Sequence, residues 1–88
     1  MKIKKEYVMR EVAGQAIVIA IGKESEQFKG MINLNRTGKD VWTYLEKGLD
    51  FVAIAKKMAG KYEVDENTAM HDVESMVDRL YRIGVLEP

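Results

Sequence analysis

The chain has 88 residues and no cysteine, and its 14 basic side chains balance its 14 acidic ones. A chain of this length forms one small domain with little interior for a buried active site, so we expect a single domain over residues 1–88. The lack of cysteine excludes disulfides, thiolate nucleophiles and most structural zinc sites, and it is typical of a cytoplasmic protein. The zero net charge disfavours a protein whose affinity depends on neutralising phosphates.

The first third of the chain predicts β-strands. Residues 6–13 alternate imperfectly between apolar and polar, and Gly14–Gln15 can form a tight turn. The run "AIVIAI" at residues 16–21 is the clearest strand, and a third short strand is expected at about residues 28–34. The run at 16–21 is too short for a signal-peptide core or a membrane span, so we expect a soluble protein without a membrane partner.

The remainder predicts three helices with marked ends. Asn35 or Thr37 can cap the first helix, and Gly48 suits its end. Asp50 can cap the second helix. Residues 65–83 predict the third helix, with Gly84–Leu86 folding back onto the core. A small sheet followed by three helices indicates an α+β fold, with a three-stranded antiparallel sheet in a winged helix-turn-helix-like arrangement.

The third predicted helix has an unusually wide apolar surface. Its main stripe comprises Ala69, Val73, Met76, Leu80 and Ile83. A margin of Met70, Val77 and Tyr81 widens the apolar arc to about 160°. Beside that margin lies a polar and acidic rim that includes Glu74 and Asp78. The helix is therefore either wedged between two neighbours, or open along one margin.

Motifs for catalysis are missing from the sequence. His71 is the only histidine, and no second histidine or cysteine exists to complete a transition-metal site. Neither dinucleotide-binding nor phosphate-loop glycine patterns occur, and Ser25 and Ser75 have no triad histidine. We expect no enzyme activity, no catalytic residue, no metal and no cofactor.

Nucleic-acid binding is one remaining interpretation, because in a winged helix the third helix would enter the major groove. The exposed side of that helix has only Arg79 and Arg82 against five acidic residues: Asp65, Glu66, Asp72, Glu74 and Asp78. Phosphates would be repelled along most of its length. A DNA-binding or scaffold domain therefore stays as the alternative, and we expect no nucleic-acid partner.

Peptide recognition is the other interpretation. Residues 31–34 form a short, uncharged and apolar strand without the lysine or proline that often protects a sheet edge. An extended peptide can add to such an edge, and the margin of Met70, Val77 and Tyr81 would form a second wall. Two other readings stay open: both features belong to the core, or the edge pairs with a second copy. We therefore expect a monomer or a weak dimer.

The residues from 31 onward resemble the PqqD family, the small peptide chaperones of pyrroloquinoline quinone biosynthesis. The family shares its fold with the RiPP recognition elements of ribosomal peptide modification pathways. The resemblance covers about residues 6–86. It lies in the order and spacing of Leu34–Asn35, Thr37–Gly38, Val41–Trp42, Leu45, Gly48, Tyr62, Val64, Asp72–Val73, Leu80 and Ile83–Leu86.

The resemblance implies a function in natural product biosynthesis. The chain would bind the leader of a precursor peptide and present that peptide to a modifying enzyme, such as a radical SAM protein, a cyclase or a peptidase. The leader would add as a strand at the third strand and lie against the third helix. Carried over, the peptide-binding residues are Met31, Ile32, Asn33 and Leu34 in the strand, and Met70, Val73, Glu74, Val77 and Tyr81 in the helix. The acidic rim of Glu74 and Asp78 motivates the hypothesis that the leader carries a flanking Lys or Arg.

Overall fold

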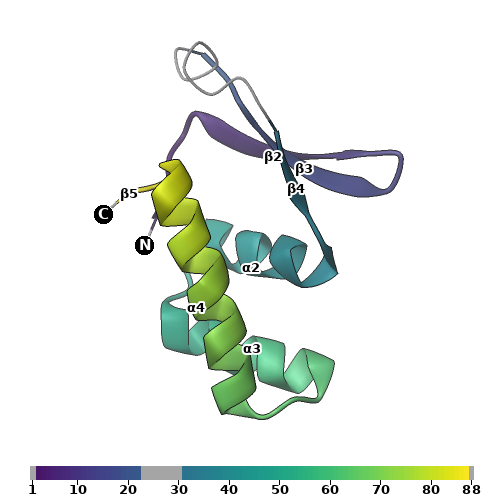
Figure 1. Ribbon diagram of the computed structural model, residues 1–88, viewed down its shortest axis with the longest axis vertical. Coiled ribbons are helices and arrows are strands. Elements are labelled where there is room, and N and C mark those ends of the chain that lie inside the picture. Colours follow the sequence, from purple (N-terminus) through teal and green to yellow (C-terminus); the bar gives the residue numbers. More distant parts are fainter. Residues whose placement is uncertain (1, 23–30, 88) are drawn as a thin grey trace.

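The computed structural model describes residues 2–22 and 31–87, and it has a three-stranded antiparallel sheet followed by three helices (Figure 1). The strands of this sheet are β2 (Tyr7–Val12), β3 (Gln15–Ala20) and β4 (Ile32–Leu34), in the order β2-β3-β4. The helices are α2 (Arg36–Glu46), α3 (Phe51–Tyr62) and α4 (Glu66–Ile83). The predicted α+β fold is therefore confirmed. The part of the third predicted strand at residues 28–30 lies outside the described residues.

The pairing of β3 with β4 decides which face of the sheet is buried. Ile32 lies opposite Val18 and Leu34 lies opposite Ala16, and all four side chains are buried. Opposite residues of an antiparallel pair share a face, so the intervening Asn33 points to the other side. Three isoleucines of residues 16–21 therefore occupy the outer face, where Ile21 is 44% exposed. The smaller side chains of β3 form the inward face.

Each helix begins at a side chain that accepts a backbone hydrogen bond from three residues further on. The pairs are Asn35 with Gly38, Asp50 with Ala53, and Asp65 with Thr68, at 2.7–2.8 Å. The structure thus selects Asn35 over Thr37 as the first cap, and the Thr37 hydroxyl donates to Asn35 Oδ1 at 3.1 Å. Gly84 ends α4 with a left-handed φ of 93°, as its position predicted.

A second, two-stranded sheet joins the chain ends. β1 (Lys2–Ile3) pairs antiparallel with β5 (Leu86–Glu87), so both termini lie side by side near the end of α4 (Figure 1). Val85 and Leu86 are buried, as the expected return onto the core requires. The pairing itself was not predicted, because two-residue strands carry no periodic pattern.

The core lies between the inward face of the sheet and the helices. Its largest fully buried side chains are Trp42, Ile54, Leu80, Val18, Val73 and Val85. Figure 1 shows the β2–β3 hairpin extending away from the three helices. The end of β4, by contrast, continues directly through Asn35 into α2, which places the β4 edge close to the helical part.

A polar cluster connects α2 with the end of α3. The Tyr62 hydroxyl donates a hydrogen bond to the Asp40 carboxylate, and Lys61 Nζ lies 3.0 Å from Asp40 Oδ2. Burial raises the pKa of Asp40, but the Tyr62 hydrogen bond and the Lys61 charge together hold that pKa below its ordinary value of 3.8. The cluster therefore stabilises the α2–α3 contact in the ionised state of Asp40.

Candidate functional site

The free edge of β4 is the first component of the candidate site. Within residues 2–22 and 31–87, β4 pairs with β3 on one side and with no strand on the other. Ile32 and Leu34 are each 4% exposed, whereas Asn33 is exposed and Met31 is 59% exposed. The strand has no charged residue or proline along this edge. Its outward N–H and C=O groups are a template for an added strand.

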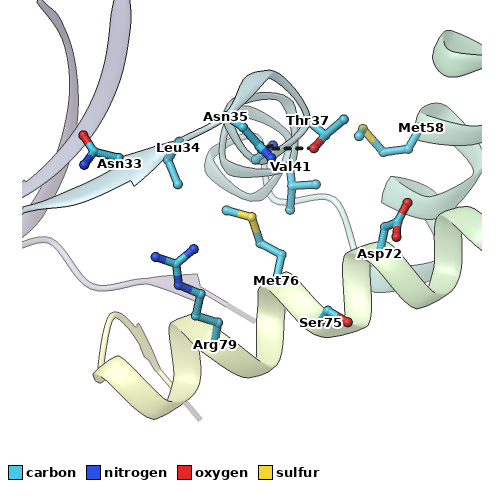
Figure 2. A pocket seen from close by; sticks show the side chains of 11 residues that line it. Asn33, Leu34, Asn35, Thr37, Val41, Met58, Asp72, Ser75, Met76 and Arg79 are labelled. Atoms are coloured by element: carbon cyan, nitrogen blue, oxygen red, sulfur yellow. Dashed lines mark hydrogen bonds between the residues drawn. The ribbon is translucent and has the colours of Figure 1, made fainter.

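A hollow lies beside this edge, and we call it the β4–α4 groove. It has a volume of about 420 Å³. Its lining comes from β4, the start of α2, α3 and α4: Asn33, Leu34, Asn35, Thr37, Gly38, Val41, Met58, Asp72, Ser75, Met76 and Arg79. Figure 2 shows Arg79 at the β4 end, Met76 in the middle facing α2, and Asp72 with Met58 at the α3 end. The groove therefore continues from the sheet edge along one side of α4.

The floor of the groove is apolar and closely packed. Leu34, Val41 and Met58 are buried, and the half-buried Met76 lies over the first turn of α2. Gly38 permits this approach, since a Cβ at that position would lie 3.2 Å from Met76 Sδ and 3.1 Å from Asn35 Oδ1. Because Gly38 has no side chain, the Met76 side chain can pack against the first turn of α2 and line the groove.

Two charged side chains of opposite sign border the groove. Arg79 and Asp72 are both exposed, and neither forms an ion pair with a described residue. In Figure 2 the guanidinium of Arg79 points from α4 toward β4, while Asp72 lies at the opposite end of the groove. The groove therefore has an electrostatic direction, positive near the sheet and negative near α3.

A second hollow of about 590 Å³ adjoins the first at Asn33, Leu34 and Asn35. Its other lining residues are Gly14, Gln15, Ala16, Arg36 and Lys39. Lys39 pairs with Glu11, whereas Arg36 has no ion pair among the described residues. Positive charge therefore extends beyond the end of β4.

The structure brings together only some of the residues that the sequence suggested. Asn33 and Leu34 line the β4–α4 groove, and Met31 and Ile32 flank them. The predicted helix residues are Met70, Val73, Glu74, Val77 and Tyr81, and none of them lines either hollow beside β4. Val73 and Val77 are buried in the core at 0% and 6% exposure. Met70 is half-buried, while Glu74 and Tyr81 are exposed elsewhere on α4.

The groove instead uses the opposite margin of α4. Asp72, Ser75, Met76 and Arg79 form that margin, and sequence reasoning had assigned only Met76 to the apolar stripe. The available signal was Gly38, a residue without a side chain in the first turn of a helix, where a close neighbour is expected. The acidic rim also lies away from the groove, and its Asp78 pairs with Arg82 at 2.9 Å.

Residues 2–22 and 31–87 contain no group of three or more His, Cys, Asp or Glu side chains that could hold a metal ion. Among the described helices, none combines the length and the apolar composition that a membrane-spanning segment requires.

Comparisons with known proteins agree with this architecture. A solved structure described as "TbiB1 in Complex with the TbiA(beta) Leader Peptide" superposes with a TM-score of 0.84 and 23% sequence identity. The alignment covers 99% of this chain and 95% of that chain. No curated protein matches the sequence. The family described as "Coenzyme PQQ synthesis protein D (PqqD)" matches residues 7–86, which span nearly the whole chain. The chain therefore belongs to the PqqD family.

Proposed function

We propose that this protein is a non-catalytic chaperone that binds the leader of a ribosomally made precursor peptide as an additional strand on β4. The observation that carries the proposal is the uncharged edge of β4, which has no second strand partner among the described residues and lies beside the β4–α4 groove. Membership of the PqqD family supports it, as does the fold shared with TbiB1, which was solved with a leader peptide.

In strand addition, the backbone of β4 and the side chains around the groove contribute to peptide binding in different ways. Residues 31–34 offer the edge, and hydrogen bonds to their backbone supply affinity that depends little on the peptide sequence. Alternate side chains of the added strand point to one face, so every second residue would enter the groove. We assign the helical wall to Asp72, Ser75, Met76 and Arg79, because Val73 and Val77 of the sequence-based assignment are buried in the core.

The bound leader would leave the rest of the precursor free for a modifying enzyme. We propose a radical SAM protein, a cyclase or a peptidase as that partner, from the family resemblance of the sequence. A gene for a short precursor peptide beside a gene for such an enzyme would identify both partners. Copurification of the enzyme with this chain and the precursor would then test the complex.

Proline substitutions on β4 test the proposed mode of binding. Consecutive N–H groups of an antiparallel strand point alternately to the paired side and to the open side. Of Ile32→Pro and Asn33→Pro, we therefore expect one to lose a hydrogen bond to β3 and the other to keep the β3 pairing but bind peptide at least about tenfold more weakly. Ile32→Pro also removes a side chain that is only 4% exposed, so it lowers stability in either case. The probe is a peptide of about ten residues selected from a random display library, a length that spans the groove at about 3.3 Å per residue.

The matched control is the other edge of the same sheet. Met9→Pro and Arg10→Pro place the same change on β2, which is separated from β4 by β3. The better-folded of these two variants should bind the selected peptide as the unmodified protein does. Retained affinity in folded Ile32→Pro and Asn33→Pro variants would contradict strand addition at β4.

A further inference from the structure

The charges that border the β4–α4 groove restrict which peptides it accepts. Met76 and Arg79 are three residues apart on α4, so they occupy the same side of successive turns. Met76 is half-buried over the apolar floor, whereas Arg79 is exposed and points toward β4 without an ion pair among the described residues (Figure 2). An apolar side chain and a cation without an ion pair among the described residues thus lie side by side.

An added strand would meet these two side chains at a defined spacing. Successive turns of a helix are about 5.4 Å apart, and residues i and i+2 of a strand are separated by about 6.6 Å. Both of those strand residues point to the same face. One can therefore contact Met76 while the other reaches Arg79, but adjacent residues i and i+1 cannot, because they point to opposite faces.

The charged side chains around the groove determine which charge a bound peptide should carry at each end of the groove. Arg36 lines the second hollow, which adjoins the groove at Asn33, Leu34 and Asn35, and it adds positive charge beside β4. Asp72 lies at the far end of the groove beside Met58 and would repel a carboxylate there. The predicted basic residue of the leader depended on Glu74 and Asp78, and neither of them lines the groove. Asp78 also pairs with Arg82.

We propose that the groove selects peptides in which an Asp or Glu lies two residues from a large apolar side chain. The apolar side chain packs on Met76, and the carboxylate pairs with Arg79. This inference rests on the proposed function and specifies the ligand of the same site. It makes the leader an acidic amphipathic strand, with its negative charge at the sheet end of the groove.

Two defined peptide libraries test the inference. Both contain one Leu or Phe and one Glu in otherwise random ten-residue peptides (about 33 Å when extended). In the first library the two residues are at i and i+2, and in the second they are at i and i+1. Binding is measured for the unmodified protein, for Arg79→Glu, and for the control Arg82→Glu. The control makes the same charge change on the same helix, at a side chain that is 80% exposed and outside the groove.

The unmodified protein should enrich the first library over the second. Arg79→Glu should weaken binding of the selected peptides by about five- to tenfold at low salt and shift selection from Glu toward Lys, whereas Arg82→Glu should do neither. Circular dichroism checks that both variants fold. Enrichment without a preference for spacing, or equal losses in both variants, would overturn the inference and leave the proposed function standing. A failure of the unmodified protein to enrich any peptide, random libraries included, would overturn both.

Discussion

Two sides of α4 perform different tasks with side chains that adjoin one another in sequence. The core side consists of Ala69, Val73, Val77 and Leu80, none of which is more than 6% exposed. The groove side consists of Asp72, Ser75, Met76 and Arg79. Met76 and Val77 are neighbours, yet a rotation of about 100° per residue sends one to the groove and the other to the core. One helix can thus hold the fold together and also present a binding surface.

The strongest test of this difference is one truncation on each side. Leu80→Ala should lower the free energy of unfolding by about 2–5 kcal/mol, because Leu80 is 1% exposed and the change leaves a cavity. Met76→Ala should cost about 1 kcal/mol or less, since its side chain is only half-buried, but it should weaken peptide binding more than any change in stability explains.

Urea unfolding followed by tryptophan fluorescence measures both variants, because Trp42 is the only tryptophan and is fully buried. Peptide anisotropy gives the affinity. Equal losses of stability in the two variants would remove the distinction between the sides of α4.

A smaller effect is expected at the polar cluster, which lies on neither side of α4. Tyr62→Phe removes the hydrogen bond to the Asp40 carboxylate and should lower stability by about 1–2 kcal/mol at neutral pH. Asp40 has a lowered pKa in the folded protein, so its contribution is complete above the unfolded value of 3.8 and is lost as the pH falls through the folded value.

The stability difference between Tyr62→Phe and the unmodified protein should therefore shrink below about pH 4. Urea titrations at a series of pH values measure it. Peptide affinity at neutral pH should not change, because Asp40, Lys61 and Tyr62 do not line either hollow beside β4. A difference that persists at the lowest pH would show that the ionised carboxylate is not the relevant partner.

The smallest change in stability is expected at Gly38. Alanine favours a helix over glycine by about 1 kcal/mol, but its Cβ would crowd Met76 Sδ and Asn35 Oδ1. These opposing effects should leave the free energy of unfolding within about 1 kcal/mol of the original. Met76 must shift to make room, so peptide affinity should fall. Gly60→Ala in α3 is the control, since a Cβ there meets nothing within 4 Å. Equal peptide affinities in the two variants would show that the space at Gly38 does not affect peptide binding in the groove.

Much of the fold could be predicted from local signals. Asp50 and Asp65 begin their helices as predicted, and Asn35 is one of the two caps predicted for α2, because a side-chain cap satisfies backbone N–H groups only a few residues away. Gly84 ends α4 for a similarly local reason. The order of strands and helices, and the overall resemblance over residues 7–86, also followed from the sequence.

The candidate site was predicted only in part. The β4 edge was recognised from its lack of charge and proline, and the structure leaves it without a second strand partner among the described residues. The sequence predicts a helical wall that includes Met70, Val77 and Tyr81, which stays a prediction, and the lining of the β4–α4 groove includes Asp72, Met76 and Arg79 instead. A helical wheel of α4 shows a wide apolar arc but has no information about which of its margins a neighbour covers.

The sequence by itself determined the three helices, their ends, the two longer strands and the uncharged character of the β4 edge, because these follow from residues a few positions apart. Only the tertiary structure decided which margin of α4 faces the groove, and that β1 and β5 pair across the whole length of the chain. These features depend on the angle at which α4 packs on the other helices and on the close approach that Gly38 permits. That angle results from the combined packing of side chains from every element, which no local pattern encodes.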